Sequence, residues 1–301
     1  MSTMRWQRLI KFENFQGEVH FGEPIINSAD ELAEKLALGK LEANQLTGDS
    51  IPDLRPSGIK SVVAKLVGPL TSADVPIIKC IGLNYTKHIK EAGRTPPPYP
   101  SIFIKGSPSI AEWNEDIPIH LIAQKDQLDY EGELCIYIGK DGKNIPREQA
   151  LEYIAGYTIG NDISARTWQR DPQFAGKVPQ WCFAKGFDKF APVGPMIVSP
   201  ELVGYADNLE LQTLVNGQIR QHTNTSDLLF GVVDIVSFCS QGTTLQKGTI
   251  IMMGTPAGVA LGMNPPRWLN DGDVVEVKIQ NLGSLRNRMV FERDGMVWQK
   301  K

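Results

Sequence analysis

The sequence of 301 residues lacks the features that mark membrane proteins and nucleic-acid-binding proteins. No apolar run approaches the roughly 18 residues that a membrane-spanning helix needs, and no signal peptide opens the chain. No long basic run is present that would neutralise several phosphates, and 31 basic residues oppose 34 acidic ones. We therefore expect a cytoplasmic protein that binds neither nucleic acids nor membranes. The basic and apolar residues of the segment 5–12 leave a mitochondrial presequence as an alternative.

Cysteine and histidine are scarce. The four cysteines form no CxxC pair, and no histidine lies nearby at the spacing of a zinc site, so we expect reduced and buried thiols. Several catalytic motifs are also missing, namely a GxGxxG after a strand, a Walker A loop, HExxH and GxSxG. These absences weigh against dinucleotide-binding, P-loop, zincin and α/β-hydrolase enzymes.

The residues that are present predict a small first unit and a large second one. Residues 1–70 contain an alternating strand pattern followed by a helix, with Ser28 as its N-cap and Gly39 as its end, which is typical of a small α+β cap. Residues 71–301 consist mainly of predicted strands bounded by Gly, Pro, Asn or Asp. The predicted strands are 75–83, 134–138, 154–159, 193–198, 209–215, 249–253 and 274–279, and helical patterns cover 84–92, the residues after Asp162, and 226–240. The predicted fold class is α+β, mainly β, as a roll or sandwich.

Acidic residues alternate along one predicted strand. Asp129, Glu131 and Glu133 fall on one face because the side-chain period of a strand is two. Carboxylates that lie so close repel one another unless a positive group lies between them. The pattern is typical either of a metal site or of a sheet end that faces water.

A further carboxylate, Asp162, lies among apolar and small residues, and a buried carboxylate needs a partner to stay ionised. A helix that starts there would place Asp162, Arg166 and Gln169 on one face, although a helix N-cap with an ordinary ion pair has the same pattern. Together with Glu131 and Glu133, Asp162 would supply three hard oxygen ligands, which suit Mg²⁺ or Mn²⁺.

Two other residues are candidates for catalysis. His88 and Glu91 are three residues apart on a short predicted helix, so the carboxylate can hold the imidazole in one tautomer, as a general base requires. A structural histidine is the alternative. Lys185 lies between apolar residues, where a lysine either reaches the surface or meets an anion inside a site.

Most of these residues lie in six ordered motifs, and together the motifs resemble the fumarylacetoacetate hydrolase family over about 210 residues. The branch with the most similar motifs is the short-chain one that includes oxaloacetate tautomerases, with acylpyruvate hydrolases and oxaloacetate decarboxylases as neighbours. The six motifs are IGLNYTKH (81–88), LDYEGEL (128–134), GNDISAR (160–166), KGFD (185–188), VNG (215–217) and GTPAG (254–258).

The resemblance implies a mixed β-roll, a homodimer, and one Mg²⁺ or Mn²⁺ per subunit. The metal ligands it implies are Glu131, Glu133 and Asp162. It also implies that His88 and Glu91 form the catalytic base dyad when a lid over the site orders, and that Lys185 takes part in catalysis. The substrate contacts it implies are Tyr85, Arg166, Gln169, Lys185 and Thr255.

Two positions depart from the family pattern. Larger members have an aspartate ligand where this chain has Asn84, so we expect three carboxylate ligands. Many members have an aspartate where this chain has Thr167, which leaves the orientation of Arg166 open.

The resemblance implies a metal-dependent enzyme that acts on a small 2-oxo (β-diketo) acid through an enolate. Oxaloacetate tautomerisation and acylpyruvate-type C–C bond hydrolysis are the two reactions expected first. The alternatives are an oxaloacetate decarboxylase, a dedicated biosynthetic or catabolic relative, and a non-catalytic dimeric protein that binds 2-oxo acids.

Overall fold

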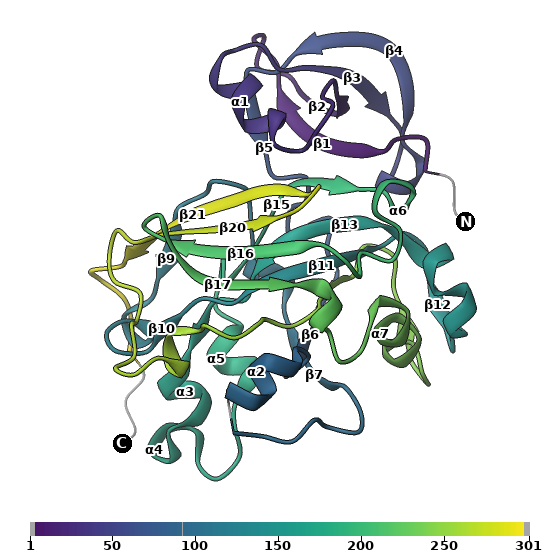
Figure 1. The fold of residues 1–301 in the computed structure, drawn as a ribbon. Coiled ribbons are helices and arrows are strands. Elements are labelled where there is room, and N and C mark those ends of the chain that lie inside the picture. Colours follow the sequence, from purple (N-terminus) through teal and green to yellow (C-terminus); the bar gives the residue numbers. More distant parts are fainter. Residues whose placement is uncertain (1–3, 92, 298–301) are drawn as a thin grey trace.

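The computed structural model describes residues 4–91 and 93–297, and it confirms a mainly-β fold with few helices. Figure 1 shows a lobe of the first strands with α1 at one end of the molecule and the helices α2, α3, α4 and α5 at the opposite end. The helices are α1 (Glu31–Ala37), α2 (Thr86–Glu91), α3 (Arg166–Arg170), α4 (Pro172–Ala175), α5 (Trp181–Lys185), α6 (Pro200–Val203) and α7 (Val232–Cys239). No helix of these described ranges is long and apolar enough to cross a membrane.

One large sheet runs through both parts of the molecule, because β1 pairs with β15 of the second part. In spatial order its strands are β4 (Arg55–Val62), β3 (Glu42–Thr47), β2 (Val19–Pro24), β1 (Arg8–Glu13), β15 (Ala191–Val198), β13 (Ile154–Asn161), β11 (Gly132–Ile138), β19 (Ile250–Met252), β6 (Ile78–Gly82) and β7 (Ser101–Lys105). Two short strands join beside this path, β5 (Lys65–Val67) on β1 and β8 (Ile110–Ala111) on β15.

A second sheet packs against the middle of the large one. Its strands, in spatial order, are β17 (Gln218–Asn224), β16 (Glu210–Val215), β20 (Val274–Ile279), β21 (Gly283–Phe291) and β9 (Ile117–Ile119). Two small pairs complete the strands, β10 (Leu128–Asp129) with β14 (Ser164–Ala165) and β12 (Gly142–Lys143) with β18 (Thr244–Leu245).

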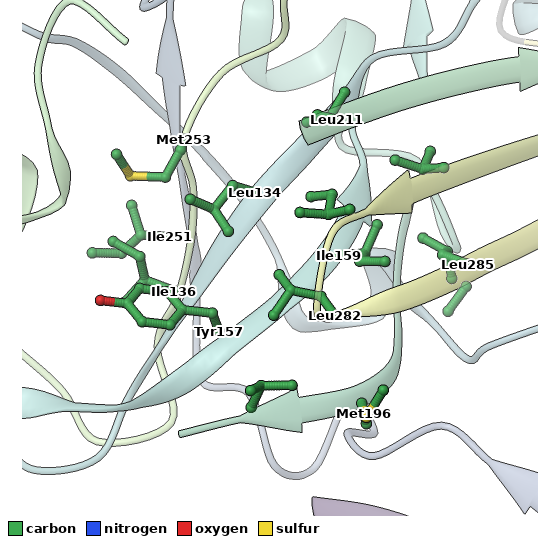
Figure 2. Packing of buried hydrophobic residues seen from close by; sticks show 14 of the residues in the cluster. Leu134, Ile136, Tyr157, Ile159, Met196, Leu211, Ile251, Met253, Leu282 and Leu285 are labelled. Atoms are coloured by element: carbon green, nitrogen blue, oxygen red, sulfur yellow. The ribbon is translucent and has the colours of Figure 1, made fainter. Parts of the chain in front are cut away.

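The main hydrophobic core lies between these two sheets. Figure 2 shows side chains of the large sheet, such as Leu134 and Ile159, facing Leu211 and Leu285 of the second sheet. Every residue of β11 is buried, so β11 lies in the interior on both faces. The face of β11 that points away from the second sheet carries Glu133, and the functional site lies there.

The helix of the first unit begins differently from the prediction. Its N-cap is Asp30, which makes no side-chain capping bond, so the predicted cap at Ser28 is wrong. The carboxylate of Glu31 instead accepts hydrogen bonds from the backbone N–H of Asn27, at 3.2 Å, and from its side-chain amide, at 3.0 Å. The predicted end is confirmed, because Gly39 follows the helix with a φ of 63°, which favours glycine.

Candidate active site

The pairing of two buried strands brings three carboxylates together. Glu131 directly precedes β11, Glu133 is its second residue, and Asp162 directly follows β13. The two strands are antiparallel, with Gly132 opposite Asn161, so the start of β11 meets the end of β13. One carboxylate oxygen from each acidic residue lies within 4.8 Å of the other two, and all three side chains are buried.

Two cations from neighbouring helices contact this acidic triad (Glu131, Glu133 and Asp162). The Lys185 Nζ, at the end of α5, lies 2.7 Å from a carboxylate oxygen of Glu131 and 2.7 Å from one of Asp162. Arg166, at the start of α3, donates to Glu131 at 2.5 Å and to Asp129 at 2.8 Å. Both Lys185 and Arg166 are buried, so the alternative in which Lys185 reaches the surface is wrong.

Lys105 is a third buried cation, which the sequence analysis missed. Its Nζ lies 2.5 Å from Asp162 Oδ1 and donates a hydrogen bond of 2.5 Å to the backbone carbonyl of Phe190. The residue ends the edge strand β7, and its side chain is fully buried. A signal was present, since Lys105 follows the apolar segment 102–104 just as Lys185 follows an apolar segment.

The three carboxylates differ in how far their charge is compensated. Burial raises the pKa of Glu131, but the positive charges of Lys185 and Arg166 and a hydrogen bond from Lys185 lower it to about 2. Burial and the negative charges of Asp162 and Glu131 raise the pKa of Glu133 well above its usual range. The Glu133 carboxylate accepts a hydrogen bond of 2.7 Å from the Gly254 backbone N–H, and no ion pair involves it among the described residues.

This imbalance fits a divalent cation. The triad offers only hard oxygen donors, which Mg²⁺ and Mn²⁺ prefer, and a bound cation would remove the repulsion that raises the pKa of Glu133. Asn84 is not available as a further ligand, because its side chain donates to the carbonyls of Met253 and Phe230 and accepts from the Phe230 N–H.

Two sequence predictions about local geometry are wrong. Asp162 lies before β14 and not on α3, which begins at Arg166, so its carboxylate pairs with lysines and not with Arg166. Asp129 is not on one continuous strand with Glu131 and Glu133, as the alternation predicted, since β10 ends at Asp129 and β11 begins only at Gly132. Its carboxylate accepts from the N–H groups of Ala260 and Leu261 and from Arg166, so it orients Arg166.

The predicted pairing of the candidate general base His88 with Glu91 is formed in this structure. His88 Nδ1 lies 2.9 Å from Glu91 Oε2 on α2, and the other Glu91 oxygen accepts a hydrogen bond of 3.0 Å from the Gly258 N–H. Burial raises the pKa of Glu91, but the hydrogen bonds from His88 and Gly258 lower it below its usual value. The carboxylate is therefore ionised at neutral pH, and it fixes the His88 ring.

A cavity of about 190 Å³ extends from the His88–Glu91 pair to the acidic triad. It is lined by His88 and Glu91 and also by Glu131 and Lys185. The predicted substrate contacts Arg166, Gln169 and Thr255 line it as well. The Gln169 side-chain oxygen accepts a hydrogen bond of 3.0 Å from Arg166, so the two side chains are held together.

Tyr85 lies outside the lining of this cavity. Its side chain is fully buried, and burial together with the charge of Glu133 raises the pKa of its hydroxyl. Its backbone bridges to Leu228. The structure therefore places Tyr85 behind the triad, where its role as a substrate contact stays a prediction.

Aromatic side chains form one wall of the cavity. Trp181 and Phe103 pack edge to face with their ring centroids 5.2 Å apart, and both line the cavity. A Cβ atom at Gly82 would lie only 2.2 Å from the Trp181 ring, so the indole needs glycine at this position. The sequence analysis identified neither aromatic residue as part of the site.

The comparisons with known proteins agree with the geometry. The family profile described as fumarylacetoacetate (FAA) hydrolase C-terminal matches residues 77–290, which is more than half of the chain. The chain belongs to the fumarylacetoacetate hydrolase family. The matched residues include the whole acidic triad and the His88–Glu91 pair.

Several family members are similar over most of their length. Oxaloacetate tautomerase YisK of Bacillus subtilis is 37% identical over 227 residues, covering 75% of this chain and 73% of the relative. Caffeoylpyruvate hydrolase of Neonothopanus nambi is 36% identical over 296 residues, covering 96% and 94%. The crystal structure of 2-hydroxyhepta-2,4-diene-1,7-dioate isomerase from Mycobacterium marinum has a TM-score of 0.76 at 33% identity, covering 96% of this chain and all of that one. The chain is thus an enzyme of the hydrolase and isomerase type found in this family.

Replacing Lys105 with methionine should destabilise the fold, because Asp162 would lose one of the two cations that compensate its buried charge. We expect a loss of about 3 kcal/mol in the free energy of unfolding, measured by urea denaturation. Lys60→Met is the matched control, since Lys60 pairs with Glu42 at the surface and its removal should cost less than about 1 kcal/mol. Equal losses for the two variants would contradict the assignment.

Replacing Glu133 with glutamine should weaken metal binding without weakening the fold. Glutamine has the shape of the neutral acid, so the metal-free variant should keep its free energy of unfolding or gain about 1 kcal/mol. The affinity for Mn²⁺, measured by calorimetry, should fall about 100-fold or more. An unchanged Mn²⁺ affinity in a folded variant would exclude Glu133 as a ligand.

Proposed function

We propose that this protein is a divalent-metal-dependent enzyme that acts on a small 2-oxo acid, as an oxaloacetate tautomerase or as an acylpyruvate-type C–C bond hydrolase. The observation that carries the proposal is a single cavity lined by both the His88–Glu91 pair and the triad carboxylate Glu131. A general base and a candidate cation site therefore face the same small volume. The names of the relatives support the substrate class, because an oxaloacetate tautomerase and a caffeoylpyruvate hydrolase both act on 2-oxo acids.

Glu131, Glu133 and Asp162 would hold Mg²⁺ or Mn²⁺, and the bound ion supplies positive charge for the carboxylate and the 2-oxo oxygen of the substrate. Lys185 adds a fixed positive charge at the cavity wall, where negative charge develops on the substrate oxygen during enolisation. Arg166 and Gln169 orient the substrate from the start of α3. Arg166 itself is held by Asp129 and Glu131, which fixes its orientation although Thr167 replaces the aspartate of many relatives.

His88 moves the proton. The hydrogen bond with Glu91 assigns the ring proton to Nδ1, which leaves Nε2 free to accept a proton. In a tautomerase, His88 takes the proton from carbon in the keto form, while the oxygen gains one to give the enol, and the reverse direction returns a proton to carbon. In a C–C hydrolase it takes the proton from the attacking water. Decarboxylation needs the same enolate and no base, so it is the reaction that would survive without His88.

Proton NMR of oxaloacetate and of acetylpyruvate distinguishes these reactions. Metal-stripped protein should change neither compound. After addition of Mg²⁺ or Mn²⁺, faster enol-to-keto exchange identifies a tautomerase, and acetate with pyruvate from acetylpyruvate identifies a C–C hydrolase. Pyruvate formed from oxaloacetate would identify a decarboxylase, and the absence of any metal-dependent change would contradict the proposal.

The variant His88→Ala should lose about 100- to 10,000-fold of this turnover in the same NMR experiment, because the general base is gone. Its Mn²⁺ affinity should stay that of the unmodified protein. His222→Ala is the control, since His222 pairs with Glu210 at the surface and lies outside the cavity lining. Equal activity in the two variants would show that His88 is not the base.

We also propose that the chain works as a homodimer in the cytoplasm, with mitochondria as the alternative that the name of the human relative, mitochondrial oxaloacetate tautomerase FAHD2A, suggests. The edge strand β7 supports an assembly, because Ile102 and Ile104 are exposed on it. Sedimentation should give about twice the chain mass of 33.3 kDa, and a monomer at micromolar concentration would contradict the dimer.

A further inference from the structure

Two arginines line the cavity without being used by the site described above. Arg94 and Arg170 belong to the lining together with Arg166 and Lys185. Arg166 and Lys185 are paired with buried carboxylates. Neither Arg94 nor Arg170 makes an ion pair with any carboxylate in the part of the chain that the structure describes.

The two arginines come from different elements and meet at the same part of the cavity. Arg94 follows α2, three residues beyond Glu91, and Arg170 is the last residue of α3, one helical turn beyond Arg166. Burial lowers the pKa of Arg170, and the positive charges of Arg94 and Arg166 lower it further, because these guanidinium groups lie close to one another. Both residues are partly open to solvent, so they line the outer end of the cavity, whereas Lys185 lines its buried end.

Three acidic residues that lie beside these arginines in the cavity lining or in the sequence have other partners. Glu91 accepts hydrogen bonds from His88 and from the Gly258 N–H. Glu131 is bound by Arg166 and Lys185. Asp171 follows Arg170 directly, but its side chain accepts a hydrogen bond of 2.9 Å from the Gln173 N–H and caps α4. Two like charges are thus held together at the outer end of the cavity, with no anion of the described residues between them.

We propose that Arg94 and Arg170 bind a second carboxylate at the distal end of the substrate, so that the enzyme selects 2-oxo dicarboxylates over 2-oxo acids with a neutral end. This inference rests on the proposed function for the position of the 2-oxo acid end. A guanidinium group donates two parallel hydrogen bonds to a carboxylate, and a carboxylate between two guanidinium groups also removes their mutual repulsion. A neutral acyl group does neither.

The proposal distinguishes oxaloacetate tautomerisation from acylpyruvate hydrolysis, which the metal site alone does not distinguish. The distal end of oxaloacetate is a carboxylate, whereas that of acetylpyruvate is a methyl ketone. The aromatic wall of Phe103 and Trp181 carries no charge that would distinguish a carboxylate from a methyl ketone. The charge at the outer end of the cavity therefore decides between them, and it favours the dicarboxylate.

Equilibrium binding of two inert probes tests this inference apart from turnover. 2-Oxoglutarate and 2-oxopentanoate have the same chain length, and only the first has a distal carboxylate. With the Mg²⁺-saturated protein in a calorimeter, we expect 2-oxoglutarate to bind about 10- to 100-fold more tightly than 2-oxopentanoate. In the double variant Arg94→Gln/Arg170→Gln this ratio should fall to about 1 to 3, with the affinity for 2-oxopentanoate unchanged.

The control is the double variant Lys90→Gln/Lys177→Gln, which also removes two positive charges. Both lysines are exposed near the same helices and lie outside the cavity lining, so the ratio should stay that of the unmodified protein. An equal affinity of the unmodified protein for the two probes would overturn the proposal, as would a ratio that survives in the arginine variant. A missing turnover of oxaloacetate and acetylpyruvate with the ratio intact would overturn the proposed reaction and leave the dicarboxylate site standing.

Discussion

The charge balance of one buried cluster is the constraint on which the rest of the structure depends. Four carboxylates and three cations lie together below the first turn of α3, all of them buried. The cluster consists of Asp129, Glu131, Glu133, Asp162, Lys105, Arg166 and Lys185. Each cation comes from a different element, and each carboxylate borders a strand of the interior, so the sheets and helices must be in place for any of these charges to be compensated.

The same balance gives the site its chemistry. The three cations contact Asp129, Glu131 and Asp162, which leaves Glu133 with a raised pKa and without a cation among the described residues. A divalent ion fits at this point because it adds the charge that the cluster needs. The fold thus compensates most of the negative charge itself and leaves a remainder at Glu133, which a divalent ion would neutralise under the proposed function.

Local sequence patterns predicted much of the fold, because they depend on neighbours along the chain. The alternation of β20 predicted Val274–Ile279 with both ends correct, and the buried strands β11 and β13 were predicted within a few residues. The pair Glu131 and Glu133 was accessible for the same reason, since they lie two residues apart, whereas Asp162 was added from its apolar setting and the family resemblance. Lys105 was missed although it follows an apolar segment as Lys185 does, and this local signal does not show that its partner is Asp162, 57 positions away. Asp162 was placed on a helix because its spacing to Arg166 suits one, whereas tertiary packing inserts β14 between them.

The site contains residues shared with the family and residues that lie outside the family motifs. The six motifs cover the triad, His88 and Lys185, which are the parts that every reaction at this site would share. Arg94 and Arg170 lie outside those motifs, and only the lining of the cavity brings them to the site. The general chemistry is therefore readable from shared residues, while the preference for one substrate depends on residues that only the three-dimensional arrangement brings together.

A crystal structure of the protein soaked in Mn²⁺, with anomalous scattering data collected for manganese, tests the central claim most directly. The account predicts one strong anomalous peak per chain, about 2 Å from an oxygen of each of Glu131, Glu133 and Asp162. A peak bound elsewhere, or no peak at the triad at saturating Mn²⁺, would contradict the account.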